Sequence, residues 1–307
     1  MIEPKAIRIA LVMLTFNQRD KTLECLANLK TIEEPPFTVV LWDNGSQDGT
    51  VEAVSQAFPQ VVAHHHTENL GVAPGRNAAA EFAIERLSPT HLLFLDNDML
   101  LEPNFVTGLL QPFLEDPRVG QTQAKLRFMY DKERLNDGGG CRVTFWLGRT
   151  LPVGYGEIDR GQHDQRKPCV ACGGAMMVRT EIFQQLGGFD TKFGHLGPDD
   201  LDFSLRLSKA GYLALYTPEA VAYHEVTHTY GADYGEKYAR LKAYNWFVFM
   251  RRHASIPQQL AFFFAGLPYL TATIIVREIR RGNLGALRGL ARGALDFFRP
   301  LLRFRKS

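Results

Sequence analysis

The stretch HLLFLDNDM, residues 91–99, closes a strongly apolar run with two acids set one residue apart. Leu92 to Leu95 have the length and composition of a buried strand, so Asp96-Asn97-Asp98 stands at the carboxyl end of that strand. Carboxylates at such a place either turn the chain or hold a cation. The choice between these two interpretations depends on what surrounds the segment.

Three further strands precede this one, at Ile7–Leu14, Phe37–Trp42 and Val61–His65. Each is followed by turn residues and then by a helical pattern, of which the alanine-rich 78–87 is the clearest. Strands that alternate with helices predict an α/β domain with a mostly parallel central sheet and helices on both faces.

Polar residues follow the strand ends, and they are Asn17, Asp43, Asn69 and the pair Asp96/Asp98. In sheets of this kind, ligands bind beyond the carboxyl ends of the strands. Each residue alone is an ordinary turn residue, but together they predict one binding site at one edge of the sheet.

Composition limits the class of protein. The chain has 307 residues, 45% of them hydrophobic, which suffices for one large domain or two modest ones. Its four scattered cysteines indicate a reducing compartment rather than a disulfide framework, and no secretory signal precedes the first strand, so a cytoplasmic location is expected. Cys169 and Cys172 form a CxxC pair without a second pair to complete a zinc site, and we interpret them as structural.

Charge is distributed unevenly along the chain. Residues 277–307 hold nine Lys or Arg against two acids, a net charge of +7, while the preceding residues hold 26 basic and 31 acidic side chains, a net charge of −5. A basic tail on an acidic body predicts an anionic partner, either a membrane surface or nucleic acid. The chain has no recognisable nucleic-acid-reading motif, so we expect no nucleic acid.

Four motifs carry a family resemblance, and they are TFN (15–17), WDNGSQDGT (42–50), NLGVAPGRN (69–77) and FLDNDM (94–99). In this order they resemble the nucleotide-sugar-binding half of a family 2 glycosyltransferase with the GT-A fold. CGGAMMVRTEIFQQLGGFD (172–190) and GPDDLDFSLRLSKAGY (197–212) continue the match, which spans about residues 7–228. The chain is most similar to bacterial rhamnosyltransferase-type members.

The resemblance implies a single GT-A catalytic domain over residues 1–230, with a nucleotide-sugar half at about 1–100 and an acceptor half at about 101–230. A helical extension, 231–307, would follow. The implied activity is inverting transfer of a sugar from a dTDP- or UDP-sugar to a hydroxyl of a glycan or lipid-linked acceptor. A sugar-1-phosphate nucleotidyltransferase would show a glycine-rich basic loop where TFNQRD stands, and a non-catalytic nucleotide-sugar-binding module would not require the acids at 199–202.

The resemblance also assigns donor-binding roles. Asp43 would accept a hydrogen bond from a pyrimidine N–H, with Thr15 and Asn17 lining the same pocket; their alternatives are an Asx-turn and helix capping. Gly71, Arg76 and Asn77 belong to a loop at a helix start, where backbone N–H groups and a guanidinium suit a phosphate or a sugar.

Asp96-Asn97-Asp98 fits the DXD signature, in which carboxylates hold Mn²⁺ or Mg²⁺ that also binds the donor diphosphate. Asp98 would be the direct ligand, while Asp96 would bind the metal or, with Asn97, the donor. His224 in VAYHEVTH matches a histidine that completes this site, with His228 as a second candidate and a structural histidine as the alternative. The run His64-His65-His66 is interpreted as solvated.

The helix that begins near Phe203 is preceded by Asp199-Asp200-Leu201-Asp202. Acids cap helix starts, which is the alternative to a catalytic role. The family pattern is usually Glu-Asp-x-Asp-Leu, and this chain has Asp199 where Glu is common. We expect Asp200 to be the general base and Asp199 to support it, with an exchange of the two roles left open.

Two segments remain outside the motifs. The polar loop 138–167 is expected to be a lid over the acceptor site. Beyond it, Leu260–Val276 is apolar but shorter than a bilayer span of about 20 residues, which favours packing or interfacial attachment. Arg288, Arg292, Arg299 and Arg303 fall on one side of a helical wheel, which is typical of a helix on an anionic membrane; packing on the catalytic domain is the alternative. We therefore expect peripheral contact at the inner face of the cell membrane.

Overall fold

The computed structural model describes residues 6–32, 34–171, 174–195, 197–226 and 235–303, and the chain divides into two compact units. The sheet unit comprises Met1–Cys141, Pro152–Gly194 and Asp199–Val226. The helical unit comprises Arg142–Leu151, His195–Pro198 and Thr227–Ser307. A short stretch from inside the predicted catalytic domain, residues 142–151, therefore belongs to the helical unit.

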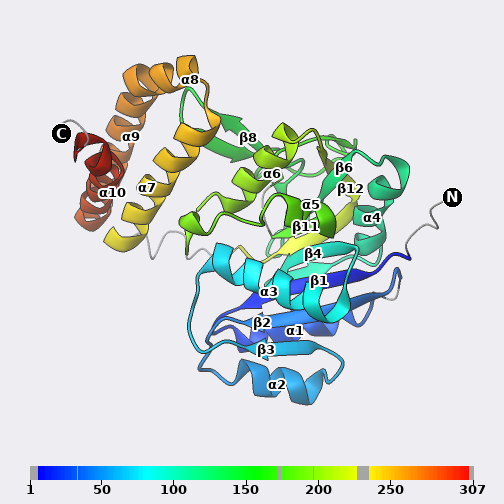
Figure 1. Cartoon of the computed structure of the whole chain (residues 1–307). Helices are drawn as coiled ribbons and strands as arrows, with labels where there is room; N and C mark the ends of the chain where they lie inside the picture. The colour runs from blue at the N-terminus through cyan, green and yellow to red at the C-terminus, as the bar shows by residue number, and fades with distance from the viewer. Residues whose placement is uncertain (1–5, 33, 172–173, 196, 227–234, 304–307) are drawn as a thin grey trace. The chain divides into compact units, whose positions relative to one another are not determined.

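The first half of the sheet unit alternates strands with helices, as its apolar pattern predicts. The elements are β1 (Ile9–Thr15), α1 (Arg19–Leu29), β2 (Phe37–Asp43), α2 (Thr50–Ala57), β3 (Val62–His65), α3 (Val72–Leu87) and β4 (His91–Asp96). The four strands are parallel, in the order β3-β2-β1-β4. Their carboxyl ends therefore lie at one edge of the sheet (Figure 1).

The second half extends this sheet beyond β4 with strands of both directions. Its elements are β5 (Met99–Leu101), α4 (Phe105–Glu115), β6 (Val119–Phe128), β7 (Leu135–Asp137), β10 (Lys167–Pro168), β11 (Ala175–Arg179), α5 (Thr180–Gln185), a 3-10 turn (Thr191–Phe193), α6 (Asp199–Lys209) and β12 (Leu213–His224). β11 runs antiparallel to β4 and β6, whereas β12 is parallel to β6 and antiparallel to β5. The predicted mixed α/β fold is confirmed.

Alternate residues of the central strands face two separate cores. Leu11 and Leu93 pack in the core formed with α1, α2 and α4, whereas Val12 and Phe94 pack in the core formed with α3, α5 and α6. This two-sided burial explains why the strands read as continuous apolar runs in the sequence.

Buried charges tie the long loop between β7 and β10 to β6. Lys125 Nζ lies 3.0 Å from an Asp159 carboxylate oxygen and also contacts Asp164, and Arg127 lies 2.7 Å from Asp159. Lys125 and Asp159 are almost completely buried. The part of the expected lid that holds Asp159 and Asp164 is thus fastened to the sheet.

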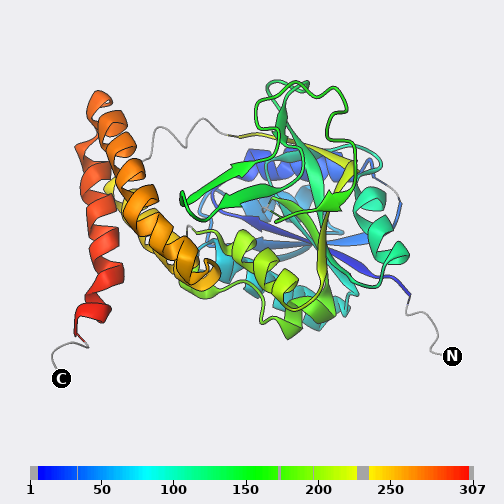
Figure 2. The same ribbon diagram turned by 90° about the horizontal axis from the view of Figure 1, so that it is seen from above.

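The helical unit consists of a hairpin and a set of helices (Figures 1 and 2). The elements are β8 (Cys141–Thr144), β9 (Arg149–Pro152), α7 (Glu236–His253), α8 (Ile256–Ala261), a π-helical turn (Phe262–Gly266), α9 (Leu267–Arg280) and α10 (Leu284–Arg303). The hairpin packs on the helices within this unit, since Phe145 and Phe249 stack with ring centroids 6.1 Å apart. The predicted C-terminal helices are confirmed.

Candidate active site

Strand register brings the polar strand ends together. Thr15 is paired with Asp43 across β1 and β2, and Leu14 is paired with Asp96 across β1 and β4. Residues that the sequence separates by tens of positions therefore lie in one row at the carboxyl edge of the parallel strands.

Asp96, Asp98 and His224 form a cluster at this edge, with one ligand atom from each lying within 4.8 Å of the others. The histidine arrives from the end of β12, whose last residue pairs with Met99 of β5. His224 Nε2 lies 3.5 Å from Asp98 Oδ1, too far for a good hydrogen bond, while its Nδ1 lies 3.0 Å from Asn136 Oδ1. The second nitrogen is thus held by a neighbour, as in many histidine ligands.

The cluster fits a divalent cation by its unsatisfied groups. Asp98 Oδ1 is buried and has no hydrogen-bond partner among the described residues. Burial opposes the charge of His224, but Asp98 and Asp96 outweigh burial and raise its pKa. Asp98 Oδ1 is thus a buried oxygen without a hydrogen-bond donor in the described part of the chain, and the His224 imidazole lies beside two carboxylates. This arrangement is expected at a site for a divalent cation.

Arg76 connects the DXD segment to the acids of α6. Its guanidinium lies 2.7 Å from Asp96 Oδ1 and 3.7 Å from Asp199 Oδ2. The side chain is buried, which opposes its charge, but Asp96, Asp199 and Asp200 outweigh burial and raise its pKa. Two acidic motifs about a hundred residues apart in the sequence therefore share the buried guanidinium of Arg76.

The acids that begin α6 have different environments. Asp202 is fully buried and pairs with Arg206 at 2.7 Å. Asp199 is 4% exposed, and burial together with the charge of Asp200 raises its pKa to about 7 against the opposing effect of Arg76. Asp200 Oδ1 accepts a hydrogen bond from Leu201 N, the next residue of α6, at 2.7 Å. The start of α6 therefore holds an acid pair in which one pKa is strongly perturbed, next to acids that also suit a helix start.

Asp43 is buried and hydrogen-bonds to the loop that follows β2. Its carboxylate accepts hydrogen bonds from the backbone N–H of Ser46 at 3.2 Å and from the Ser46 hydroxyl, and it contacts His65 Nδ1 at 2.5 Å. We interpret the histidine run as solvated, and the His65 side chain is indeed 46% exposed, but the run also makes specific contacts. His65 pairs with Asp43, and the ring of His64 lies 4.3 Å from that of Trp42. The parallel register that places Asp43 beside His65 is the signal that the sequence pattern alone did not supply.

Thr15 and Asn97 lie together in a buried hydrogen-bonded cluster. Asn97 Nδ2 donates to Thr22 Oγ1 at 2.9 Å and to Thr15 Oγ1 at 3.2 Å, and the two threonine hydroxyls are 2.9 Å apart. Asn17 has φ of 51° and accepts a hydrogen bond from Gln47 N at 2.8 Å. These contacts hold the loop after β1 against the neighbouring loops.

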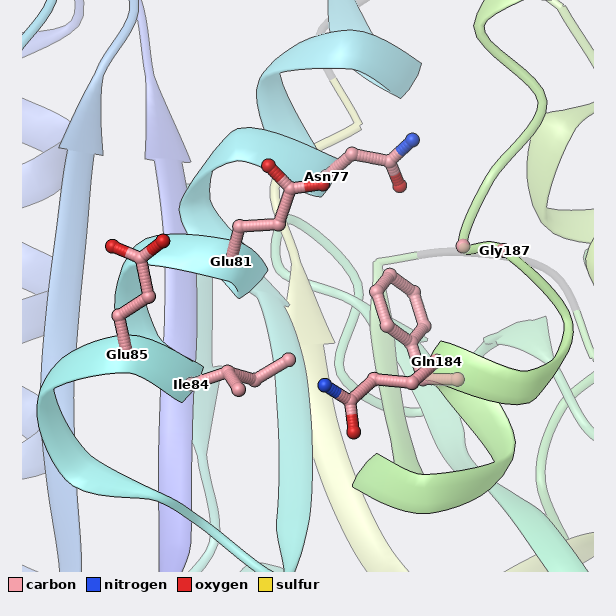
Figure 3. Close-up of a pocket in the computed structure, with 8 residues that line it drawn as sticks. Asn77, Glu81, Ile84, Glu85, Gln184 and Gly187 are labelled. Atoms are coloured by element: carbon pink, nitrogen blue, oxygen red, sulfur yellow. The ribbon is translucent and has the colours of Figure 1, made fainter.

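The loop before α3 is fastened in a similar way. Gly71 has φ of 91°, a conformation that favours glycine, and its N–H donates to Asn69 Oδ1 at 2.8 Å. The Asn77 amide exchanges two hydrogen bonds with the backbone of Phe189, at 2.7 and 2.9 Å. Figure 3 shows Asn77 at the rim of a pocket of about 310 Å³ between α3 and the segment at Gly187.

Some predicted residues fall elsewhere. Burial raises the pKa of the Cys169 thiol, in keeping with the structural interpretation of that residue. Its partner in the CxxC pair, Cys172, and the second candidate histidine, His228, lie outside the described residues, as does the side chain of Arg303.

Comparison with known proteins identifies relatives of this arrangement. The model of the family described as "Glycosyltransferase like family 2" matches residues 4–243. The N-acetylglucosaminyl-diphospho-decaprenol L-rhamnosyltransferase of Mycobacterium tuberculosis is 29% identical over 242 residues, which cover 73% of this chain and 78% of the relative.

Two solved structures share the fold. The mannosyltransferase PcManGT from Pyrobaculum calidifontis, in complex with GDP-Man and Mn²⁺, has a TM-score of 0.57 at 18% identity, covering 97% of this chain and 91% of its own. GalNAc-T7 with UDP, GalNAc and Mn²⁺ has a TM-score of 0.62 at 13% identity, covering 80% and 48%. These likenesses show the GT-A fold.

Proposed function

Because the chain belongs to glycosyltransferase family 2, we propose that it transfers a sugar, with inversion, from a dTDP- or UDP-sugar to a hydroxyl of a glycan or lipid-linked acceptor. The observation that carries this proposal is the buried guanidinium of Arg76 between Asp96 and Asp199. It joins the motif expected to hold the donor diphosphate to the motif expected to hold the base. Cell-surface polysaccharide synthesis is the process we assign, by similarity to the mycobacterial relative.

Asp98, His224 and Asp96 would hold Mn²⁺ or Mg²⁺. When bound, the cation supplies positive charge that stabilises the departing diphosphate. Arg76 would share Asp96 with that site and offset part of the negative charge of Asp199 and Asp200. Asn136 fixes the orientation of the His224 ring through its Nδ1 contact.

The donor nucleotide would lie along the strand ends of β1 and β2. In this proposal Asp43, oriented by Ser46 and His65, receives a pyrimidine N–H. Thr15 and Asn97 already hydrogen-bond to each other. They would therefore form the base of the donor pocket rather than bind the donor directly. Asn17 and Gly71 shape the loops beside it, and Asn77 fixes α3 so that Arg76 keeps its place.

Asp200 would take the proton from the acceptor hydroxyl, with Asp199 tuning it. Two carboxyl groups that share a site resist double ionisation, which gives the pair an apparent pKa near neutrality, where a general base works best. A base opposite the diphosphate leads to one in-line displacement, so the anomeric configuration of the donor sugar is inverted.

The test is a panel of dTDP-, UDP- and GDP-sugars with Mn²⁺, followed by NMR of the product's anomeric proton. A pyrimidine donor should be consumed fastest, and the product should have the inverted configuration. Preference for a GDP-sugar would reject the role of Asp43, and retention of configuration would reject the one-step mechanism.

We place the enzyme at the cytoplasmic face of the cell membrane, in contact with lipid through its basic C-terminal segment. The support is the net charge of +7 in residues 277–307. A lipid-linked acceptor would reach the enzyme at that surface.

A further inference from the structure

The helical run Ile256–Arg280 combines length, apolar composition and exposure. It is 25 residues long and apolar enough to cross a membrane by composition, yet only 11% of its most apolar 18-residue window is buried. The apolar stretch seen in the sequence, Leu260–Val276, is thus the middle of a longer continuous helix (Figure 2). Of the two expectations for this stretch, buried packing and interfacial attachment, buried packing does not account for this exposure.

Burial on this helix follows one stripe. Phe262, Gly266 and Glu278 are buried and Leu270 is partly buried, at spacings of four and eight residues that mark one side of a helix. The remaining sides carry large exposed apolar side chains, namely Ile256 (74% exposed), Leu260, Phe264 (83%), Ile275, Val276 and Ile279 (57%). Arginines stand just outside both ends of this apolar surface, at 251 and 252 and at 280 and 281.

The neighbouring helices exclude a bilayer crossing. α7 ends at His253, immediately before the run, and α10 begins at Leu284, immediately after it. A helix that crossed the membrane would place α7 and α10 on opposite sides. Both carry several charges along their lengths and so cannot be inside the bilayer themselves.

Instead, α7 and α10 pack directly against each other. A Cβ on Gly289 or Gly293 would collide with the backbone carbonyl of Glu236 or Arg240 on α7, so the two helices touch backbone to backbone. Arg240 also pairs with Asp296 at 2.6 Å. Both ends of the apolar run are therefore on the same side of any membrane that it touches.

We propose that helix 256–280 lies flat in the interfacial region of one leaflet of an anionic bilayer, as a monotopic anchor. Its exposed apolar side inserts at the acyl boundary, and the arginines at its two ends contact lipid phosphates. This proposal rests on the proposed function and names the apolar element of that membrane contact, next to the basic segment that begins at Arg277. Arg292 of α10 is paired with Glu236, so part of the basic segment serves helix packing.

The depth of the helix centre tests the geometry. Tyr269 is near the middle of the run and is 52% exposed, so Tyr269→Trp places a fluorophore there. With phosphatidylcholine–phosphatidylglycerol vesicles, emission above the wild-type background should be quenched most by lipids brominated near the head group. Strongest quenching by lipids brominated at the chain ends would mean that the helix crosses, and would overturn the proposal.

Vesicle flotation tests the apolar surface. The Phe264→Ser/Ile279→Ser variant should lower the vesicle partition coefficient by roughly a hundredfold, because two large apolar side chains leave the lipid. Leu114→Ser removes an equally exposed leucine from α4 of the sheet unit and should change nothing. Flotation of the double variant equal to that of the wild type would overturn the proposal. A wild-type chain that does not bind vesicles and sediments as a dimer would overturn it as well.

These measurements use neither donor nor acceptor. Donor hydrolysis by the same variants reports on the sheet-edge site separately, so failure of the transferase proposal and failure of the membrane proposal give different results.

Discussion

Arg76 is the residue on which the two halves of the site depend. Its guanidinium lies between Asp96 and Asp199. Burial and the charge of Asp200 raise the pKa of Asp199, and the charge of Arg76 lowers it. Arg76→Gln should therefore move the pH midpoint of transfer above the midpoint of the wild type, and should slow transfer by roughly a hundredfold or more. Arg118→Gln, which removes an exposed arginine paired with Asp116, should leave both unchanged. An unshifted midpoint in Arg76→Gln would contradict the coupling.

The acid pair can be divided by substitution. Asp200→Asn keeps the size of the side chain but removes a proton acceptor, so kcat should fall by about 10²–10⁴-fold while donor affinity stays near the wild-type value. In the wild type, transfer should increase as pH rises through about 7, where the pair loses its shared proton. A larger loss of kcat in Asp199→Asn would exchange the two roles.

Asp199 should also make stability depend on pH. Its folded pKa of about 7 exceeds its ordinary value of 3.8, so its contribution to folding is fully present below pH 3.8 and is lost as pH rises through about 7. Asp199→Asn removes this loss. The Tm of the variant minus that of the wild type should therefore be larger at about pH 8 than at about pH 5, as measured by thermal melting. A difference that stays constant with pH would show that Asp199 is ionised throughout.

At the scale of elements, the strands and the residues at their ends were predictable because each signal is local. An apolar run that ends in Asp96-Asn97-Asp98 needs no knowledge of its neighbours. The contact between Asp43 and His65, by contrast, exists only through the pairing of β2 with β3. The same holds for the link from Arg76 to Asp199, which joins α3 to α6 across residues that no spacing rule connects.

The packing of α7 on α10 makes a prediction with an unusual sign. Gly→Ala in a helix normally stabilises by about 1 kcal/mol. Gly293→Ala should instead lower the Tm, because its Cβ has no room beside the Arg240 carbonyl. Gly285→Ala, on the same helix, meets only ordinary contacts at 3.7–3.9 Å and should be neutral or stabilising. Equal effects of the two substitutions would contradict the close packing.

At the scale of the whole molecule, the chain forms two units, and one segment of the acceptor half belongs to the helical unit. Residues 142–151, which form most of the hairpin, pack within the helical unit although the residues before and after them belong to the sheet unit. Gly148 lies against Phe262, and the carbonyl of Trp146 lies against Gly266. No sequence pattern indicated this placement of residues 142–151, because it depends on the close contacts that Gly148 and Gly266 permit. The loop of the acceptor half thereby shares a body with the helix proposed to contact lipid.

Because the hairpin packs on helix 256–280, we predict that a change in the hairpin alters membrane binding. Gly148→Leu would place a side chain inside the ring of Phe262 at a φ of 63°, which only glycine adopts readily. We expect weaker vesicle binding and slower transfer to a lipid-linked acceptor, with donor hydrolysis unchanged. Gly156→Leu has a similarly positive φ but open space around it, so it serves as the control for backbone strain alone.

The central claim is that Asp96, Asp98 and His224 form the cation site of a nucleotide-sugar transferase. The most direct measurement is the hydrolysis of dTDP- and UDP-sugars by the wild type and by Asp98→Ala, with Mn²⁺ and with excess EDTA. The wild type should hydrolyse a pyrimidine donor only when the cation is present, and Asp98→Ala should be inactive in both conditions while keeping the wild-type Tm without metal. Full activity of Asp98→Ala, or of the wild type in EDTA, would contradict the account.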